Sequence, residues 1–148
     1  MKLEIELVPS TAWYSNLRNK VKKDVWDKIR KKSYVDANYR CSICLKDKKR
    51  LNCHEIWEYN DEKHLQRLKG FLALCDDCHM IKHIGFAGIQ ASKGIINMKK
   101  LITHFMKVNE VTREHFNKHH KEAFDLWGER SKEKWTTDLG EWSNLINR

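Results

Sequence analysis

The sequence predicts an α+β fold whose core is held together by zinc, and three observations favour it. Four of the five cysteines form two CxxC pairs, Cys41 with Cys44 and Cys75 with Cys78. Short apolar runs typical of strands lie between the pairs, and the last third of the chain has apolar residues at helical spacing. With 148 residues, 41% of them hydrophobic, the chain has the size and composition of one globular domain, residues 1–148.

The first part of the chain is expected to form a short strand and a basic helix. Leu3, Ile5 and Leu7 alternate with polar residues, which is the period of a half-buried strand. Asp24 is a good N-cap for an amphipathic helix, which belongs to a basic helical part at residues 17–38.

The middle part, residues 39–86, is expected to hold the zinc core. Residues 51–57 and 71–74 are typical of paired strands, with a polar loop between them. After the second CxxC pair, a helix is expected from about residue 77 to residue 84, ended by Gly85.

The last part, residues 95–148, is expected to be helical and to carry no chemistry. One helix covers residues 98–106, and a longer one starts near Thr112. Trp135 and Trp142 are expected to pack a C-terminal tail onto the domain. Three histidines of this part are expected on the surface: His115, His119 and His120.

The positive charge is concentrated in one segment. Residues 17–50 contain 13 Lys or Arg and 4 Asp or Glu, whereas the rest of the chain has 16 of each kind. A basic stretch of this kind favours a polyphosphate partner, with the 45–50 loop contacting the backbone, because neutralised phosphates release counterions. The alternative is a solvated helix face. No apolar run is long enough to span a bilayer, so a cytoplasmic protein without a membrane partner is expected.

The cysteine spacing favours one tetrahedral Zn²⁺ held by Cys41, Cys44, Cys75 and Cys78, since thiols stay reduced in the cytoplasm. Four sulfurs leave no open position, so this zinc is expected to be structural. A redox dithiol or an iron–sulfur cluster is the competing interpretation, disfavoured by the lack of a clustered cysteine run.

Histidines lie close to the second CxxC pair. His79 and His83 are four residues apart and therefore share one helix face, where they are able to bind a second ion. The preceding strand carries His54 and Glu55, and the zinc would hold that strand against this helix.

The segments YRCSIC, LNCHEIWEY, LALCDDCH and HMIKHIG, within residues 39–85, resemble the HNH endonuclease family, the ββα-metal nucleases, and in particular small bacterial and phage HNH proteins. The resemblance implies a treble-clef-like ββα-metal core with flanking helices. It also implies that His54 is a general base and that His79 and His83 bind a catalytic divalent ion. The expected activity is metal-dependent hydrolysis of DNA phosphodiester bonds, and the alternative is a non-catalytic zinc module that binds nucleic acid or protein.

Two departures from the family pattern leave alternatives open. Cys53 stands where many family members have a metal ligand, and the acidic residue Glu55 comes after the base. Either Glu55 completes the metal site, or His54 is itself a ligand; strand alternation would normally point these two side chains to opposite faces. Second, His79 stands where asparagine often does. Imidazole ligands favour Mn²⁺, Ni²⁺, Co²⁺ or Zn²⁺ over Mg²⁺.

Overall fold

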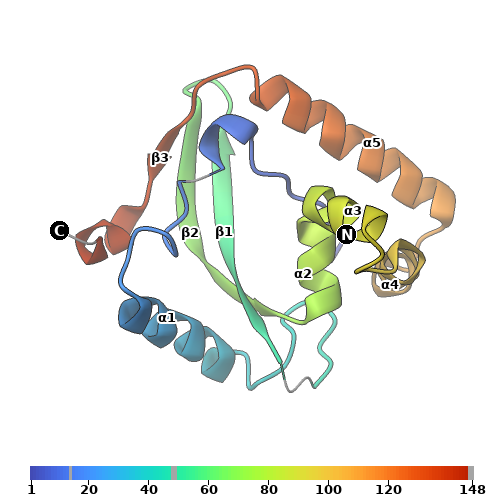
Figure 1. Ribbon diagram of the computed structural model, residues 1–148, viewed down its shortest axis with the longest axis horizontal. Helices are drawn as coiled ribbons and strands as arrows, with labels where there is room; N and C mark the ends of the chain where they lie inside the picture. The colour runs from blue at the N-terminus through green and yellow to red at the C-terminus, as the bar shows by residue number, and fades with distance from the viewer. Residues whose placement is uncertain (14, 48–49, 147–148) are drawn as a thin grey trace.

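The computed structural model describes residues 1–13, 15–47 and 50–146. Within these ranges one sheet has three strands in the order β1-β2-β3: β1 (Asn52–Asn60), β2 (Leu65–Leu74) and β3 (Thr136–Asp138). The first two form a long antiparallel hairpin, and β3 joins β2 in parallel (Figure 1). This arrangement of a small sheet with helices confirms the α+β class.

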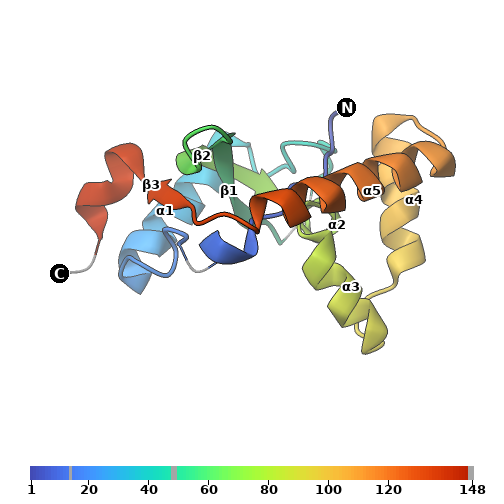
Figure 2. The same cartoon turned by 90° about the horizontal axis from the view of Figure 1, so that it is seen from above.

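The described residues form five α-helices around the hairpin: α1 (Lys23–Asp36), α2 (Asp76–Lys82), α3 (Ile84–Ser92), α4 (Met98–Asn109) and α5 (Arg113–Arg130). Short 3₁₀ helices cover Ser10–Ala12 and Gly140–Leu145. In Figure 1, α1 and the C-terminal 3₁₀ helix lie on one side of the hairpin, and α2 to α5 lie on the other. Figure 2 shows the same separation from above, with α3 projecting away from the sheet.

Each side of the hairpin has its own hydrophobic cluster. On the side of α2 to α5, Phe105 and Phe116 pack edge to face with their ring centroids 5.1 Å apart, among buried aliphatic residues and three of the cysteines. On the side of α1, Trp26 packs against Phe71, which in turn contacts Trp142. The cysteines therefore lie within a packed core.

The hairpin is longer than the sequence suggests. The segment expected to be a polar loop continues both strands, and only residues 61–64 turn between them. Gln66 and Leu68 are buried whereas Arg67 and Lys69 are exposed, which is the alternation of a strand with one buried face. The charged residues on the exposed face concealed this period.

The helix expected to end at Gly85 ends earlier, at Lys82. His83 has φ −108° and ψ 47°, a conformation outside the helical region, and the chain then turns into α3 with Gly85 inside it. The predicted helix end at Gly85 was therefore wrong, because the non-helical backbone of His83 separates α2 from α3.

Leu3, Ile5 and Leu7 belong to no strand, so this prediction was also wrong. The segment is extended but pairs with no strand among the described residues. The amides of Leu3 and Ile5 donate to side chains of α4 and α5, and the amide of Glu6 donates to the carbonyl of Lys82. Burial alternates along this segment because Leu3 and Ile5 pack into the hydrophobic cluster that contains Phe105 and Phe116.

The expectation that the 45–50 loop contacts a phosphate backbone falls partly outside the described residues. Lys48 and Lys49 of the 45–50 loop lie outside them, as do the last two residues of the chain. Among the residues that are described, no helix is long and apolar enough to cross a membrane.

Candidate metal centre

The two CxxC pairs converge on one point. The Sγ atoms of Cys41, Cys44, Cys75 and Cys78 all lie within 4.8 Å of one another, and those of Cys44 and Cys75 are 3.8 Å apart. Cys41, Cys75 and Cys78 are buried, and Cys44 is partly buried. A set of four convergent thiols is able to hold one metal ion with tetrahedral geometry.

The first pair sits on a tight turn that the local sequence shapes. The amide of Leu45 donates to the carbonyl of Cys41, and the amide of Cys41 donates to the carbonyl of Lys46. Leu45 has a φ of 64°, which lets the chain reverse directly after Cys44. The amide of Ser42 donates to the carbonyl of Ala73, and this bond fixes the turn against the end of β2.

The second pair opens α2. Cys75 is the N-cap of this helix, and its Sγ atom accepts a hydrogen bond from the amide of Cys78. The helix turn places both sulfurs on the side of the first pair. From α4, His104 approaches with its Nε2 atom 3.2 Å from Sγ of Cys78.

The thiols influence one another's protonation. Hydrogen bonding with Cys75 and Cys78 lowers the pKa of Cys41. The hydrogen bond to Cys41 raises the pKa of Cys75 to about 11, and hydrogen bonding with Cys41 and Cys75, with burial, raises that of Cys78. Hydrogen bonding within the centre therefore favours the thiolate of Cys41 over those of Cys75 and Cys78.

Next to the thiols, three histidines from β1, α2 and the residue after α2 form a second cluster. The ring centroids of His54, His79 and His83 lie 4.8 to 5.5 Å apart, all in edge-to-face arrangement. Burial and nearby charge on His54 lower the pKa of His79 to about 4 and that of His83 to about 3. One ring nitrogen from each of the three histidines lies within 4.8 Å of the other two, so the three form a second group able to hold a metal ion.

Glu55, expected near these histidines, lies elsewhere. Its carboxylate accepts a hydrogen bond from the amide of Leu17 at 3.0 Å, on the α1 side of the hairpin. The irregularity in the β1–β2 register comes later, between Ile56 and Trp57. Alternation is therefore undisturbed at positions 54 and 55, and the structure does not bring Glu55 to the histidine cluster.

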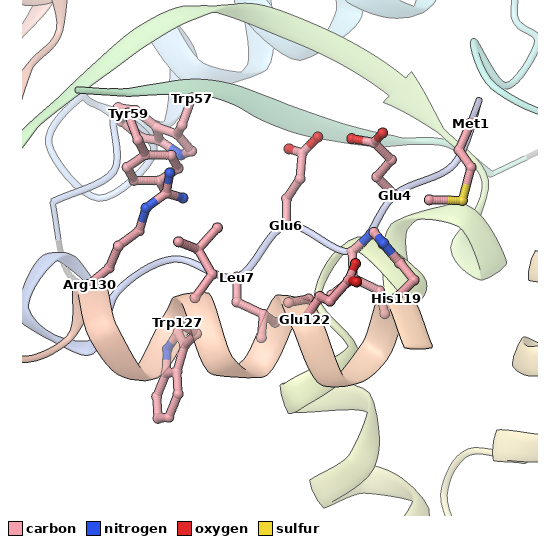
Figure 3. Close-up of a pocket in the computed structure, with 13 residues that line it drawn as sticks. Met1, Glu4, Glu6, Leu7, Trp57, Tyr59, His119, Glu122, Trp127 and Arg130 are labelled. Atoms are coloured by element: carbon pink, nitrogen blue, oxygen red, sulfur yellow. The ribbon is translucent and has the colours of Figure 1, made fainter. Parts of the chain in front are cut away.

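A cavity of about 330 Å³ lies between the N-terminal segment, β1 and α5, and Glu6 is among its lining residues. Figure 3 shows Glu4 and Glu6 pointing into the space on one side, and Arg130 beside Tyr59 at its far end. The Arg130 guanidinium lies 4.4 Å from the Tyr59 ring centroid and pairs with Asp61 at 2.8 Å. The cavity thus reaches the histidine cluster through Glu6.

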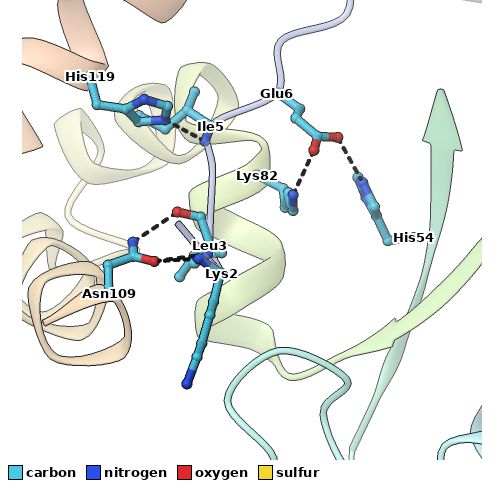
Figure 4. Close-up of polar contacts among 8 residues, drawn as sticks. All are labelled: Lys2, Leu3, Ile5, Glu6, His54, Lys82, Asn109 and His119. Carbon is cyan, nitrogen blue, oxygen red and sulfur yellow. Dashed lines mark hydrogen bonds and ion pairs between the residues drawn. The ribbon is translucent and has the colours of Figure 1, made fainter. Parts of the chain in front are cut away.

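Figure 4 shows that Glu6 joins the N-terminal segment to this site. Its carboxylate accepts a 2.7 Å hydrogen bond from the buried ammonium of Lys82, and its other oxygen lies 3.9 Å from Nε2 of His54. The latter distance is too long for a hydrogen bond. Both ring nitrogens of His54 are buried, and they have no hydrogen-bond partner in the part of the chain that the structure describes.

The same figure shows how the rest of the segment is held. The Asn109 side chain accepts from the amides of Lys2 and Leu3 and donates to the Leu3 carbonyl. His119 accepts from the amide of Ile5 and stacks on Phe105. His119 is therefore not the surface residue that the sequence suggested, because it fixes the N-terminal segment.

The fold and this site define a small α+β protein with a four-cysteine centre. Residues 46–137, more than half of the chain, match a family model described as the NapC/NirT cytochrome c family, N-terminal region. The chain belongs to this family. No curated protein and no solved structure matches it.

This match overturns the expectation of an HNH endonuclease. Hydrolysis of DNA, nucleic acid as the partner and the alternative of a zinc-containing binding module were wrong predictions, since the family is one of c-type cytochromes. The expected cofactors, structural Zn²⁺ and a catalytic Mn²⁺, Ni²⁺, Zn²⁺ or Mg²⁺ ion, are contradicted by the same finding. The site residues, the division into three parts and the cytoplasmic location stay predictions.

A sequence signal for this family was present. Residues 75–79 read Cys-Asp-Asp-Cys-His, which is the CxxCH pattern to which c-type haem is attached. The nuclease interpretation assigns Cys75 and Cys78 to one metal ion and His79 to another, so it does not treat the five residues as one motif. Sequence reasoning also missed Glu6 and His104, for which no motif exists, since each approaches the site from a distant element.

Proposed function

We propose that the chain transfers single electrons through one iron ion held by Cys41, Cys44, Cys75 and Cys78. The observation that carries this proposal is the convergence of four thiols from two distant turns. The family supports a redox role, because its name is that of a cytochrome. Sites with four sulfur ligands in tetrahedral geometry hold zinc or iron, and of these only iron changes its charge under biological conditions.

A covalent haem does not fit the CxxCH segment. Attachment requires Cys75 and Cys78 to face the edge of a porphyrin, but their residues are 3% and 0% exposed and their sulfurs face the other two thiols. The ring of His79 would have to face the iron, but it packs against His54 and His83. The other pair offers no alternative, because Leu45 follows Cys44. No step of the proposed function therefore involves haem.

The sulfur geometry suits a single ion. A tetrahedron with metal–sulfur bonds of about 2.3 Å has edges of about 3.8 Å. The Cys44 and Cys75 sulfurs are 3.8 Å apart, and every pair lies within 4.8 Å. A cluster of several irons and sulfides would hold its thiolates farther apart, so one ion is the better occupant.

The surroundings suit a one-electron change. The ion would alternate between Fe³⁺ and Fe²⁺, with the electron supplied by one redox protein and passed to another. Burial keeps water away from the ion, and a hydrogen bond from His104 to the Cys78 sulfur would offset part of the negative charge that reduction adds.

The test is reconstitution of the reduced, metal-free chain with Fe²⁺ in the absence of oxygen. We expect one iron per chain, visible absorption in the oxidised state that disappears on reduction, and a reversible one-electron titration. Cys44→Ser should abolish all three properties. Cys53→Ser is the matched control, because Cys53 lies outside the four-cysteine centre and should leave them unchanged.

Two results would contradict the proposal. The first is a chain that takes up zinc but binds no iron under these conditions. The second is haem that remains attached after denaturation and acid extraction, which would show that Cys75 and Cys78 form thioether bonds.

A further inference from the structure

A basic cleft lies between α1 and the start of β1. It has a volume of about 570 Å³, and its charged lining consists of Arg18, Lys23, Asp27, Arg30 and Arg50. Four cationic side chains and one carboxylate leave a net charge of 4 − 1 = +3. The cleft therefore attracts anions.

The one carboxylate in the cleft is already engaged. Asp27 accepts from Lys23 at 3.0 Å and from Arg30 at 2.8 Å, and these hydrogen bonds lower the pKa of Asp27 to about 2. Arg50 lies 3.6 Å from Asp76 but remains 80% exposed, and Lys23 is 89% exposed. Lys23 and Arg50 therefore present positive charge to solvent at the edge of the cleft.

The cleft reaches the four-cysteine centre in two places. His79 lines it and is bonded directly to Cys78 along the chain. Asn52 also lines it, and its side chain donates to the Leu74 carbonyl and to Asp76, the residues on either side of Cys75. A molecule docked in the cleft would therefore contact His79, the sequence neighbour of Cys78, and Asn52, which bonds to both sequence neighbours of Cys75.

We propose that this cleft is the docking surface for an acidic patch on an electron-transfer protein. The proposal rests on the proposed function, since it assigns the partner to the four-cysteine centre. The charge favours an acidic partner, and the position of His79 and Asn52 would bring that partner up to residues that adjoin the buried four-cysteine centre. The entire excess of basic residues in the sequence lies in residues 17–50, the segment that supplies Arg18, Lys23, Arg30 and Arg50 to the cleft.

The test compares two small oxidants of opposite charge with the iron-loaded, reduced chain. Ferricyanide is anionic, and hexaammineruthenium(III) is cationic. In the variant Lys23→Glu/Arg50→Glu we expect the ferricyanide rate at low ionic strength to fall about tenfold. Raising the ionic strength from about 10 mM to about 150 mM should slow the wild type in the same way.

A matched control reverses two exposed lysines of α5, Lys118→Glu/Lys121→Glu, which gives the same change in net charge away from the cleft. Its ferricyanide rate should change less than twofold. The cationic oxidant should react with the cleft variant at least as fast as with the wild type, which also shows that the variant is folded.

The outcomes separate the two proposals. If the cleft and control variants slow ferricyanide equally, the docking surface is overturned while the electron-transfer function stands. If neither oxidant reacts with the wild type, the proposed function itself fails.

Competition identifies the class of partner. Poly-L-glutamate, as an acidic polypeptide, should protect the wild type from ferricyanide, and it should not protect the cleft variant. If duplex DNA protects at lower charge concentration than poly-L-glutamate, the acidic protein partner is overturned in favour of a nucleic acid.

Discussion

The Nε2 atom of His104 lies 3.2 Å from the Sγ atom of Cys78, and this contact joins α4 to the four-cysteine centre. A hydrogen bond to a ligating sulfur stabilises the more negative, reduced state and so raises the reduction potential. We expect His104→Leu to lower the potential of the iron-loaded chain by about 60 mV for each 1.4 kcal/mol of lost stabilisation.

His104→Gln, which retains a donor, should recover part of this shift. The exposed His115 provides the control, because His115→Leu lies on α5 and should leave the potential unchanged. Spectroelectrochemical titration measures all three variants. An unchanged potential in His104→Leu would show that the contact has no electronic role.

The buried Lys82 ammonium depends on Glu6. Burial alone would raise the pKa of Glu6, but His54 and the charge of Lys82 outweigh it and lower the pKa to about 2. Since the ordinary value is 4.5, the carboxylate contributes stability that is fully present above about pH 4.5 and is lost as the pH falls towards 2. Glu6→Gln should cost about 2 kcal/mol at pH 7, because the carboxylate is partly exposed and screened.

Chemical denaturation at several pH values measures this effect. The difference between wild type and Glu6→Gln should shrink between pH 4.5 and pH 2. Glu4→Gln, in the same segment but exposed, is the control and should show little difference at any pH. A Glu6→Gln difference that does not change with pH would contradict the ion pair with Lys82.

Asn109 fixes the N-terminal segment with three hydrogen bonds to the backbone of Lys2 and Leu3. Asn109→Ala removes them, and we expect a loss of about 2 to 3 kcal/mol of stability at roughly 1 kcal/mol for each bond. Amide hydrogen exchange should show faster exchange at Leu3. Asn117→Ala, on the exposed face of α5, should leave that amide protected; equal exchange in both variants would argue against the role of Asn109.

The metal should also stabilise the fold. Cys78→Ser is expected to lower the free energy of unfolding by on the order of 5 kcal/mol or more, since metal binding and folding are coupled in such sites. Cys53→Ser should cost about 1 kcal/mol, because Cys53 lies outside the four-cysteine centre and packs against the hydrophobic cluster around Trp26. Denaturation of metal-loaded samples compares them, and similar losses would mean that the centre holds no metal.

Sequence reasoning reached the α+β class and the helices because their signals are local. The apolar spacing of α4 and α5 and the CxxC spacing are readable within a few residues. The extended segment at Leu3 and Ile5 has the same local period as a strand, and only the distant Asn109 and His119 decide that it pairs with side chains. Local patterns do not contain such contacts.

The candidate site also has features that local sequence predicts and features that it does not. Four cysteines in two pairs are readable as one centre, but the identity of its metal depends on electronic properties that spacing does not express. The CxxCH pattern at residues 75–79 was readable, whereas the burial that excludes haem from it appears only in three dimensions.

X-ray absorption at the iron edge of the iron-loaded chain measures the centre most directly. We expect a single iron with four sulfur neighbours at about 2.3 Å. A shell of nitrogen neighbours typical of a porphyrin, or a chain that retains zinc and excludes iron, would contradict electron transfer through the four cysteines.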